Sequence, residues 1–352
     1  MSTSYESYLF NFSASYSSGG LKRLLAYSKW FNKNGGARFI VSHRLKGIEE
    51  QYPANSYRFL RQTLLERAFN STGRLERLIA MDGPVRVYFS YGVPLPRRIA
   101  PVMWYHLSNV LTVVHAREYV PARLHYKYRL LGFLTLRTLQ NADVISAESR
   151  SSLRALAGVP ARHVVSVNGS DDEIAAERDA SLGADAPVDN VAVTVGTISY
   201  KMLNDVYRVF CRLRETNPGL RLDIIGAAEL IPRRILRDPL VAARGPMPQP
   251  DVCRILRRAR YYITTTLIEN SYNAAAEGVF LARESFISDI EPHRELLSSV
   301  PVEVRNDFGT RIPVLHVQRN VLTTRNLKSW DQVVRDFIAT AETELDAGGP
   351  RD

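Results

Sequence analysis

Cysteine is scarce in this chain of 352 residues, which contains only Cys211 and Cys253. Two cysteines in helix-like stretches do not form the dense disulfide framework of a small secreted protein. They are typical of buried thiols in a reducing compartment. The start, residues 1–7, also lacks a basic segment followed by an apolar run, so no signal peptide is predicted. These absences together predict a cytoplasmic protein.

The sequence also lacks a run long and apolar enough to be a convincing membrane span. The best candidate, residues 99–116, contains Pro101 and His106, and its first half is typical of a strand. The net charge of +10 is therefore the main indication of a partner. Such a charge suits nucleic acid, an anionic membrane surface or a phosphate-bearing substrate. Because no nucleic-acid-binding motif and no RNP-like aromatic pattern is present, nucleic acid is not expected as a partner.

Metal-ligand spacings and a dinucleotide fingerprint are missing as well. The seven histidines show no His-Glu-x-x-His spacing and no aspartate pair marks a divalent-metal site, so no metal or other cofactor is expected. Gly19 and Gly20 do not form a GxGxxG fingerprint, which argues against hydride transfer. They lie between a predicted strand and a helix expected to begin near Leu21, where glycines let a phosphate or an acceptor approach the backbone. An ordinary turn is the alternative.

Alternating strand-like and helix-like segments run through the chain. Its length suits two domains, and its composition, with 45% hydrophobic and 23% charged residues, is that of a globular protein. The alternation predicts an α/β fold with doubly wound sheets. Strands are expected at residues 8–13, 37–42, 85–91, 101–107, 144–148, 164–167, 191–195, 222–225, 261–267 and 285–289.

A linker is predicted at residues 175–190, which are rich in Ala, Asp and Gly and show little periodicity. This position predicts an N-terminal domain at residues 1–180 and a C-terminal domain at residues 187–327. A closing helix at residues 330–344 is expected within a last segment, residues 328–352.

The most informative segment, residues 264–278, is typical of a buried strand, a polar turn and the start of an Ala-rich helix. Glu269 follows the strand, and Glu277 lies one turn into the helix, with Asn273 expected as its N-cap. The helix start offers unpaired N–H groups to a phosphate, whereas the carboxylates suit the paired hydroxyls of a sugar. The segment therefore indicates a nucleotide-sugar site. A capped helix with two surface acids is the alternative.

Glu269 and Glu277 form the Glu-x7-Glu pattern of retaining GT-B glycosyltransferases, and the segment around them resembles glycosyltransferase family 4. Further segments resemble the family's phosphate loop, its next strand, its base-contacting turn and the turn after the second glutamate (195–201, 221–226, 245–247 and 288–296). The resemblance covers residues 191–296 and is loose in the N-terminal half. It implies the GT-B fold, in which two Rossmann-like, doubly wound domains face a central cleft and the last helix crosses back to the first domain.

The resemblance also implies roles for individual residues. Lys201 is expected to stabilise the charge that a leaving nucleoside diphosphate gains. Family members often carry an Arg where this chain has Thr197, so one cation remains where two are usual. His106, which ends an apolar run, is expected to contact the donor sugar or the acceptor, with His115 as its rival, whereas His293 is expected to shape its turn. The expected catalytic residues are His106, Lys201 and Glu269, and the expected donor-binding residues are Gly19, Gly20, Gly196, Thr197, Lys201, Met247, Asn270, Ser271, Tyr272, Asn273 and Glu277.

The function implied is transfer of a hexose or deoxyhexose to a glycan or lipid-linked acceptor of a bacterial surface polysaccharide such as lipopolysaccharide O-antigen. Residues 268–271 resemble mannosyl- and rhamnosyltransferase-like members, so a GDP-sugar is favoured over a UDP- or dTDP-sugar. No nucleophilic carboxylate is evident in the first domain, which favours front-face displacement with retention. The alternatives are a GT-B sugar-nucleotide epimerase and a catalytically silent GT-B scaffold subunit.

Residues 120–137 mix basic and aromatic side chains with a leucine-rich stripe. One interpretation is a helix on an anionic membrane surface, close to a lipid-linked acceptor. It predicts peripheral association with the inner face of the plasma membrane. The alternative is a domain helix with one buried and one solvated face.

Overall fold

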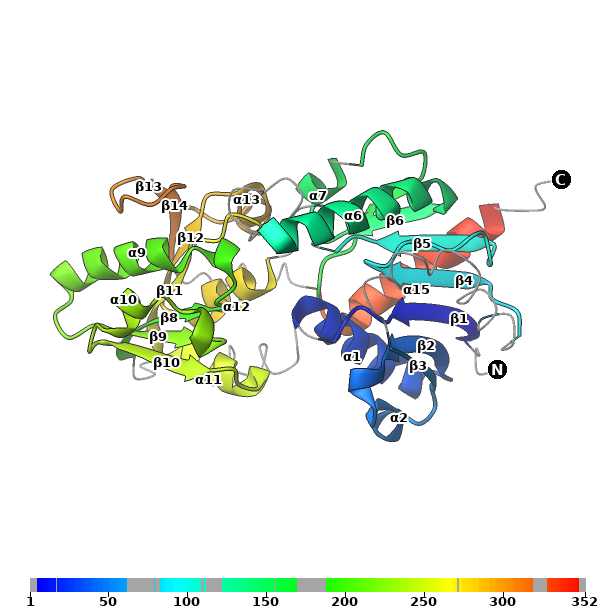
Figure 1. The fold of residues 1–352 in the computed structure, drawn as a ribbon, viewed down its shortest axis with the longest axis horizontal. Coiled ribbons are helices and arrows are strands. Elements are labelled where there is room, and N and C mark those ends of the chain that lie inside the picture. The colour runs from blue at the N-terminus through cyan, green and yellow to red at the C-terminus, as the bar shows by residue number, and fades with distance from the viewer. Residues whose placement is uncertain are drawn as a thin grey trace. The chain divides into compact units, whose positions relative to one another are not determined.

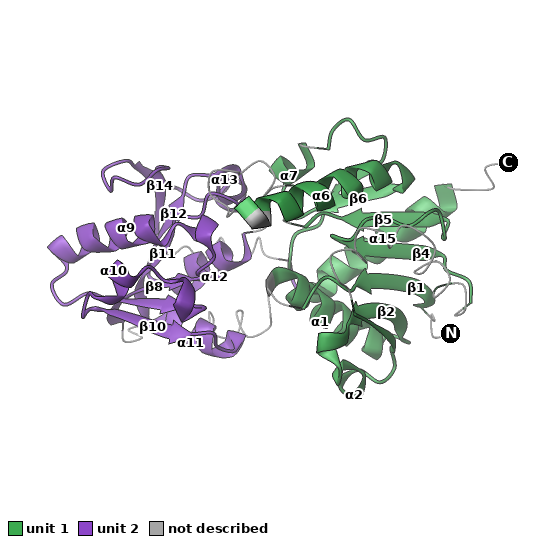
Figure 2. Ribbon diagram, viewed as in Figure 1, with its two compact units in different colours: residues 1–169, 330–352 green, residues 170–329 purple. Residues whose placement is uncertain are grey.

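The computed structural model describes residues 5–16, 18–61, 79, 83–108, 111, 122–154, 156–169, 188–270, 272–318 and 328–347. The chain divides into two compact units (Figure 2). Unit 1 comprises residues 1–169 and 330–352, and unit 2 comprises residues 170–329. Each unit contains a seven-stranded sheet.

Unit 1 has a parallel sheet in the strand order β3-β2-β1-β4-β5-β6-β7 (Figure 1). Its strands are β1 (Tyr5–Phe12), β2 (Ala37–Ser42), β3 (Ser56–Leu60), β4 (Val87–Tyr91), β5 (Val102–His106), β6 (Val144–Ala147) and β7 (Arg162–Val165). Within the described residues, its helices are α1 (Ser18–Lys33), α2 (Ile48–Gln51), α6 (Ala122–Thr138), α7 (Arg150–Arg154) and α15 (Trp330–Ala347).

Side chains alternate across this sheet, as the pleat of a strand requires. Tyr8, Phe10 and Phe12 of β1 enter a core with α1 and α15, whereas Leu9 enters a second core on the opposite face. Burial on both faces explains the nearly continuous apolar runs of the inner strands.

The C-terminal helix α15 belongs to unit 1 although unit 2 precedes it in the chain. Its Phe337 packs on Trp104 of β5, with the ring centroids 4.7 Å apart, and on Phe10 of β1 at 5.5 Å. Because all three rings are buried, this contact closes one face of the unit 1 sheet.

Unit 2 has the strand order β10-β9-β8-β11-β12-β14-β13, with β14 antiparallel to both of its neighbours. Its strands are β8 (Asp189–Val195), β9 (Arg221–Ile225), β10 (Val241–Gly245), β11 (Ala259–Thr264), β12 (Glu284–Ser288), β13 (Glu303–Arg305) and β14 (Val314–Gln318). The helices in the described part of the unit are α9 (Leu203–Thr216), α10 (Arg233–Leu236), α11 (Gln249–Arg258), α12 (Asn273–Leu281) and α13 (Glu291–Leu296). Val191 and Val193 pack toward α11 and α12, and Ala192 packs toward α9.

Each sheet has one point where the strand order reverses. It lies between β1 and β4 in unit 1 and between β8 and β11 in unit 2. The loops that leave the carboxyl ends of such strands diverge to opposite faces, and ligands of doubly wound sheets bind in the crevice between them. A ligand site is therefore expected at the residues that follow β1, β4, β8 and β11.

The predicted alternation is found in both units, but several details were wrong. Four strands were missed, namely β3, β10, β13 and β14. None of β3, β10 or β13 is a fully buried strand, so they lack the continuous apolar run on which the other predictions rested. Strand β14 is antiparallel in an otherwise parallel sheet, so the alternation of strands and helices does not predict it.

Helix and strand boundaries shifted by a few residues, as is usual at element ends. Helix α1 begins at Ser18, so Gly19 and Gly20 lie in its first turn and not before it. Tyr272, not Asn273, is the N-cap residue of α12. Strand β8 already begins at Asp189, within the predicted linker, most of which lies outside the described residues. The predicted domain boundary near residues 180–187 also falls there and stays a prediction.

Candidate functional site

Lys201 lies in the loop that leaves β8 at the reversal point of unit 2. Gly196 begins this loop with φ +97°, a conformation that favours glycine. A Cβ added to Gly196 would lie 3.3 Å from Cε of Lys201, so the lysine stem crosses directly over the glycine. The loop then closes with a 3-10 turn, Ser199–Lys201, in which the amide of Lys201 donates to the carbonyl of Ile198 at 2.8 Å. The backbone therefore fixes where the lysine side chain starts.

The loop after β11 is joined to this loop by hydrogen bonds. Thr265 donates from its hydroxyl to the carbonyls of Lys201 and Met202, at 3.3 and 3.0 Å. The amide of Leu267 donates to the carbonyl of Tyr200 at 3.0 Å. These contacts hold the two loops of the reversal point against each other.

An ion pair crosses the same point. The ammonium of Lys201 donates to the carboxylate of Glu269, and both side chains are largely buried. The structure thus brings together the two residues that were expected to be catalytic in the C-terminal domain.

Glu277 reaches the same region from α12. Gly278 lets this helix pack directly on β11, since a Cβ there would lie 2.0 Å from Cδ1 of Tyr262. Burial, followed by the charges of Glu269 and Glu277, raises the pKa of the Tyr262 phenol. Both carboxylates therefore act electrostatically on one buried phenol.

The start of α12 has the features of an anion seat. Its first turn contains no acidic residue, and none of the described side chains caps it. The amides of Asn273, Ala274 and Ala275 begin the helix, where N–H groups have no partner within the helix. Asn270 is buried in the preceding loop, and Ser271 lies outside the described residues.

The surroundings of Thr197, Met247 and His293 indicate structural roles. Thr197 is buried against Gly226, whose added Cβ would lie 2.9 Å from Cγ2 of the threonine. Met247 packs against the core that contains α11 and α12. His293 accounts for the shape of its turn, because its Nδ1 lies 2.7 Å from the carbonyl of Ser288, to which it donates. Burial is the main cause that lowers the pKa of His293 to about 4.

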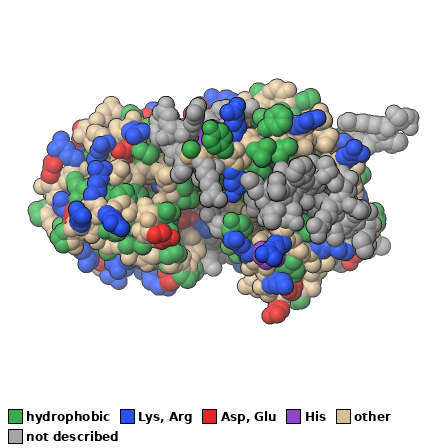
Figure 3. Space-filling model, in the orientation of Figure 1, with side chains coloured by type: hydrophobic (Ala, Val, Ile, Leu, Met, Phe, Trp, Pro, Cys, Tyr) green, Lys and Arg blue, Asp and Glu red, His purple; other side chains and the backbone are tan. Residues whose placement is uncertain are grey.

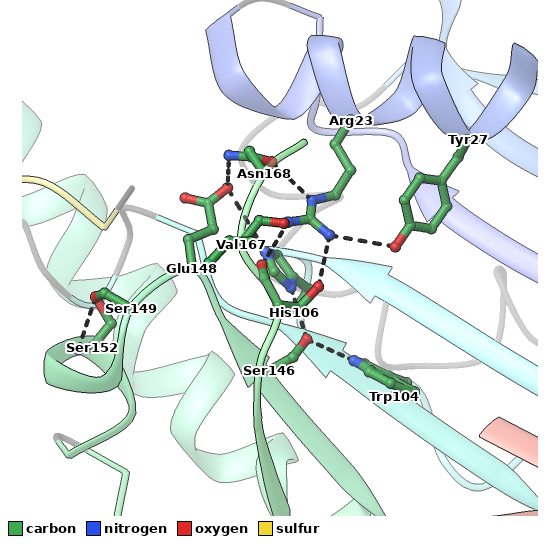
Figure 4. A network of polar contacts seen from close by, with 11 residues as sticks. Arg23, Tyr27, Trp104, His106, Ser146, Glu148, Ser149, Ser152, Val167 and Asn168 are labelled. Carbon is green, nitrogen blue, oxygen red and sulfur yellow. Dashed lines mark hydrogen bonds and ion pairs between the residues drawn. The ribbon is translucent and has the colours of Figure 1, made fainter. Parts of the chain in front are cut away.

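Unit 1 contains a buried polar network at the carboxyl ends of its strands (Figure 4). Arg23 of α1 donates to the carbonyls of Ser166 and Val167, at 2.7 and 3.2 Å, and to Oδ1 of Asn168 at 3.2 Å. Asn168 in turn donates from its amide nitrogen to the carboxylate of Glu148. The network therefore ties the first helix to the segments that follow β6 and β7.

His106 lies at the carboxyl end of β5, as expected, but its ring is fully buried. Its Nδ1 is 2.7 Å from Oγ of Ser146, which also accepts the indole N–H of Trp104 at 2.7 Å. Donation of the Ser146 hydroxyl proton to Nδ1 would leave the imidazole proton on Nε2. That nitrogen lies 3.9 Å from Oε1 of Glu148. His115 lies outside the described residues.

Burial and neighbouring charges keep His106 neutral and Glu148 ionised. Burial, and then the positive charge of Arg23, lower the pKa of His106 to about 4. Burial alone would raise the pKa of Glu148, but its contact with His106 and the charge of Arg23 lower that pKa below its ordinary range. A neutral imidazole therefore lies beside an ionised carboxylate at pH 7.

Sequence reasoning missed Glu148 and Asn168. Glu148 is a buried carboxylate at a strand exit of the first domain, where no nucleophilic carboxylate was evident from the sequence. Its position at the end of the strand predicted at residues 144–148 was the available signal. Gly20 lies at the reversal point of unit 1, where an added Cβ would come within 2.8 Å of both Ser15 Oγ and Tyr91 Cε1. It therefore allows α1 to approach the end of β4.

Among the described residues, no group of three or more His, Cys, Asp and Glu side chains is arranged to hold a metal ion. Within the same part of the chain, no helix combines the length and the apolar character needed to cross a membrane.

The sequence matches no protein-family model and no curated protein sequence. Solved structures do resemble it. HepE from Anabaena, in complex with UDP and glucose, is 14% identical over 97% of this chain and 94% of its own, with a TM-score of 0.55. Sucrose-phosphate synthase from Thermosynechococcus elongatus is 11% identical over 97% and 92%, with a TM-score of 0.60. A glycosyltransferase from Rickettsia africae is 11% identical over 96% and 98%, also with a TM-score of 0.60.

At these identities the likeness establishes the fold. The prediction of an α/β chain of the GT-B class, with two doubly wound units, is confirmed.

Proposed function

We propose that this protein is a glycosyltransferase that moves a sugar from a nucleotide-sugar donor to a glycan or lipid-linked acceptor. The observation that carries the proposal is the ion pair of Lys201 and Glu269 across the reversal point of unit 2. It lies where doubly wound sheets bind ligands, in a unit whose helix α12 begins without an acidic residue.

Each residue of this site has a role that its chemistry supports. The amides that begin α12 and the backbone at Gly196 suit the diphosphate. Glu277 suits a pair of donor hydroxyls, because a carboxylate offers two acceptor oxygens. Lys201 stabilises the charge that develops on the leaving nucleoside diphosphate, and Glu269 holds the ammonium in place beforehand.

We assign the acceptor to unit 1, where Gly19 and Gly20 would let a donor phosphate or the acceptor approach the backbone and His106 would contact the donor sugar or the acceptor. The neutral imidazole can offer an N–H or accept a proton only if the network around Glu148 opens to the substrate. We propose retention by front-face displacement, in which the leaving phosphate oxygen takes the proton of the acceptor hydroxyl. Glu148 accepts a hydrogen bond from Asn168, is buried, and is therefore assigned to the network and not to nucleophilic attack.

The finer identity of the substrates also belongs to this proposal. A hexose or deoxyhexose, mannose- or rhamnose-like, would be added to a bacterial surface polysaccharide such as lipopolysaccharide O-antigen. The sequence favours a GDP-sugar, whereas the UDP bound by HepE supports testing UDP-sugars on equal terms.

Thermal-shift and calorimetric titration with UDP, GDP, dTDP and their sugars would test donor binding. Binding of the nucleotide-sugar should be weakened in Glu277→Gln and kept in Glu303→Gln, which changes an exposed glutamate of β13. Incubation with donor alone separates epimerisation from transfer, since an epimerase needs no acceptor. A catalytically silent scaffold would bind the nucleotide but would catalyse neither epimerisation nor transfer. Retention is read from the anomeric configuration of the product by NMR.

A further inference from the structure

Helix α6 presents large apolar side chains to solvent. Tyr126, Leu130, Phe133 and Leu136 are 65%, 45%, 59% and 50% exposed. Their spacing of four, three and three residues places them along one side of the helix, and we call them the α6 stripe. Leu131, Thr135 and Leu139 are buried instead. The exposure of the stripe is therefore a property of one face and not of a poorly packed helix.

Basic side chains accompany the stripe. Arg129 and Arg137 are exposed on α6, and the helix also contains Arg123 and Lys127 but no Asp or Glu. In the space-filling view, hydrophobic side chains gather over α6 with Lys and Arg side chains among and beside them (Figure 3). An apolar stripe bordered by cations, with no acid on the same helix, complements a partner that is both apolar and anionic.

We propose that the α6 stripe docks on an anionic lipid surface. The apolar side chains enter the boundary between headgroups and acyl chains, and the arginines contact lipid phosphates. The inference rests on the proposed function for its purpose, which is to bring the enzyme to a lipid-linked acceptor. It adds the residues that make the contact.

Charge argues against a second copy of the chain as the occupant. A symmetric dimer through α6 would bring the two copies' stripes together and, with them, Arg129 and Arg137 of each. The helix has no carboxylate to pair with them, so the cations would repel each other. An anionic bilayer removes this repulsion and solvates the apolar side chains at the same time.

The test is co-flotation with vesicles of phosphatidylcholine alone and of phosphatidylcholine mixed with phosphatidylglycerol. Wild-type protein should float with the anionic vesicles and stay behind with the neutral ones. Raising the salt from about 0.1 M to about 1 M should weaken binding, because the Debye length falls from about 10 Å to about 3 Å.

Two pairs of variants locate the contact. Phe133→Ser with Leu136→Ser removes apolar area, and Arg129→Glu with Arg137→Glu reverses two charges. Each arginine at an anionic surface strengthens partitioning about fivefold, so the charge reversal should weaken it at least about 25-fold. The matched controls lie in unit 2. Leu230→Ser changes a leucine that is 52% exposed, and Arg233→Glu with Arg237→Glu makes the same change in net charge.

The inference is supported if both α6 pairs lose flotation and both controls keep it. It is overturned if wild-type protein does not float, if the controls lose as much as the α6 variants, or if light scattering shows an oligomer that Phe133→Ser with Leu136→Ser dissociates. Thermal shift with the donor is measured on every variant. Because donor binding requires no vesicle, a missing donor response contradicts the proposed function, whereas missing flotation contradicts only the membrane contact.

Discussion

Lys201 and Glu269 form an ion pair although 68 residues separate them in the chain. The pair forms because β8 and β11 are neighbours in the unit 2 sheet and the loops that follow them are hydrogen-bonded to each other. The lysine is therefore oriented before any donor arrives. A positioned cation needs no reorganisation when charge develops on a leaving group, and this is where an enzyme gains most from electrostatics.

Replacing Lys201 with Ala should reduce turnover more than donor affinity. The ammonium acts on charge that increases in the transition state, so kcat should fall on the order of 100-fold or more, while KM for the donor changes only a few-fold. Steady-state kinetics with varied donor concentration separate the two effects. Arg254→Ala, on the exposed side of α11, is the control. A raised KM for the donor with kcat unchanged would show that Lys201 contributes to ground-state binding instead.

Glu277→Gln should weaken donor binding with little effect on folding. The amide has nearly the same shape as the carboxylate but loses the charge that strengthens hydrogen bonds to hydroxyls. A hydrogen bond to a charged group contributes about 1.5–3 kcal/mol, so Kd for the nucleotide-sugar should rise about 10- to 100-fold. The free nucleoside diphosphate should bind almost as before, because Glu277 is assigned to the sugar or ribose hydroxyls. Calorimetry with both ligands decides, and an unchanged Kd for both would remove Glu277 from the site.

Gly278→Ala tests the packing that positions Glu277. The added methyl would lie 2.0 Å from Cδ1 of Tyr262, a buried ring that cannot swing into solvent. The helix or the ring must shift, and overpacking of this kind destabilises by about 1–3 kcal/mol or more. Gly158→Ala is the matched control, because an added Cβ there meets no atom within 4 Å. Urea unfolding should separate the two variants clearly, and equal stability would mean that α12 does not depend on this contact.

Much of unit 2 could be predicted because its site is built from short segments that directly follow strands. Residues 264–278 contain the end of β11, the turn and the start of α12, so the local sequence predicts both the strand–turn–helix unit, which is found, and a common site for Glu269 and Glu277, which stays a prediction. Lys201 required the further inference that β8 is a neighbour of β11. The resemblance in residues 191–296 implied only that Lys201 and Glu269 face one crevice, and the order of the sheet shows why.

The unit 1 network could not be predicted in the same way. Arg23 and Asn168 are 145 residues apart and meet only because α1 packs beside the end of β7. The order of seven parallel strands is not encoded in any local pattern, and Glu148 reads as an ordinary acid after a strand. Only the fold shows that its carboxylate is buried between Asn168 and His106. Strand β14 was missed for a similar reason, because the alternation of strands and helices does not predict an antiparallel strand.

The buried imidazole of His106 predicts a specific pH dependence of stability. Its pKa is lowered to about 4 in the folded protein, compared with about 6.5 when the chain is unfolded. Between these values the unfolded state binds a proton that the native state does not, so the free energy of unfolding decreases as the pH falls from about 6.5 toward 4. At pH 5 the loss from this residue is on the order of 2 kcal/mol.

His106→Gln should therefore flatten part of this decline. Two other histidines have shifted pKa values: that of His293 is lowered, and that of His316 is raised chiefly by its hydrogen bond with Glu284. Both residues are present in both proteins, so their contributions to the pH dependence cancel in the comparison. Glu148 affects stability at lower pH. Its ionised carboxylate stabilises the folded protein above about pH 4.3, which is the carboxyl pKa in the unfolded chain. This contribution is lost as the pH falls through the lower pKa that Glu148 has in the folded protein. Urea unfolding of wild-type and His106→Gln protein at pH 7 and pH 5 measures the difference. Parallel losses in the two proteins would show that the imidazole is already charged, or already solvated, in the folded state. An NMR titration of the His106 ring checks this directly, since the ring should remain neutral at pH 5.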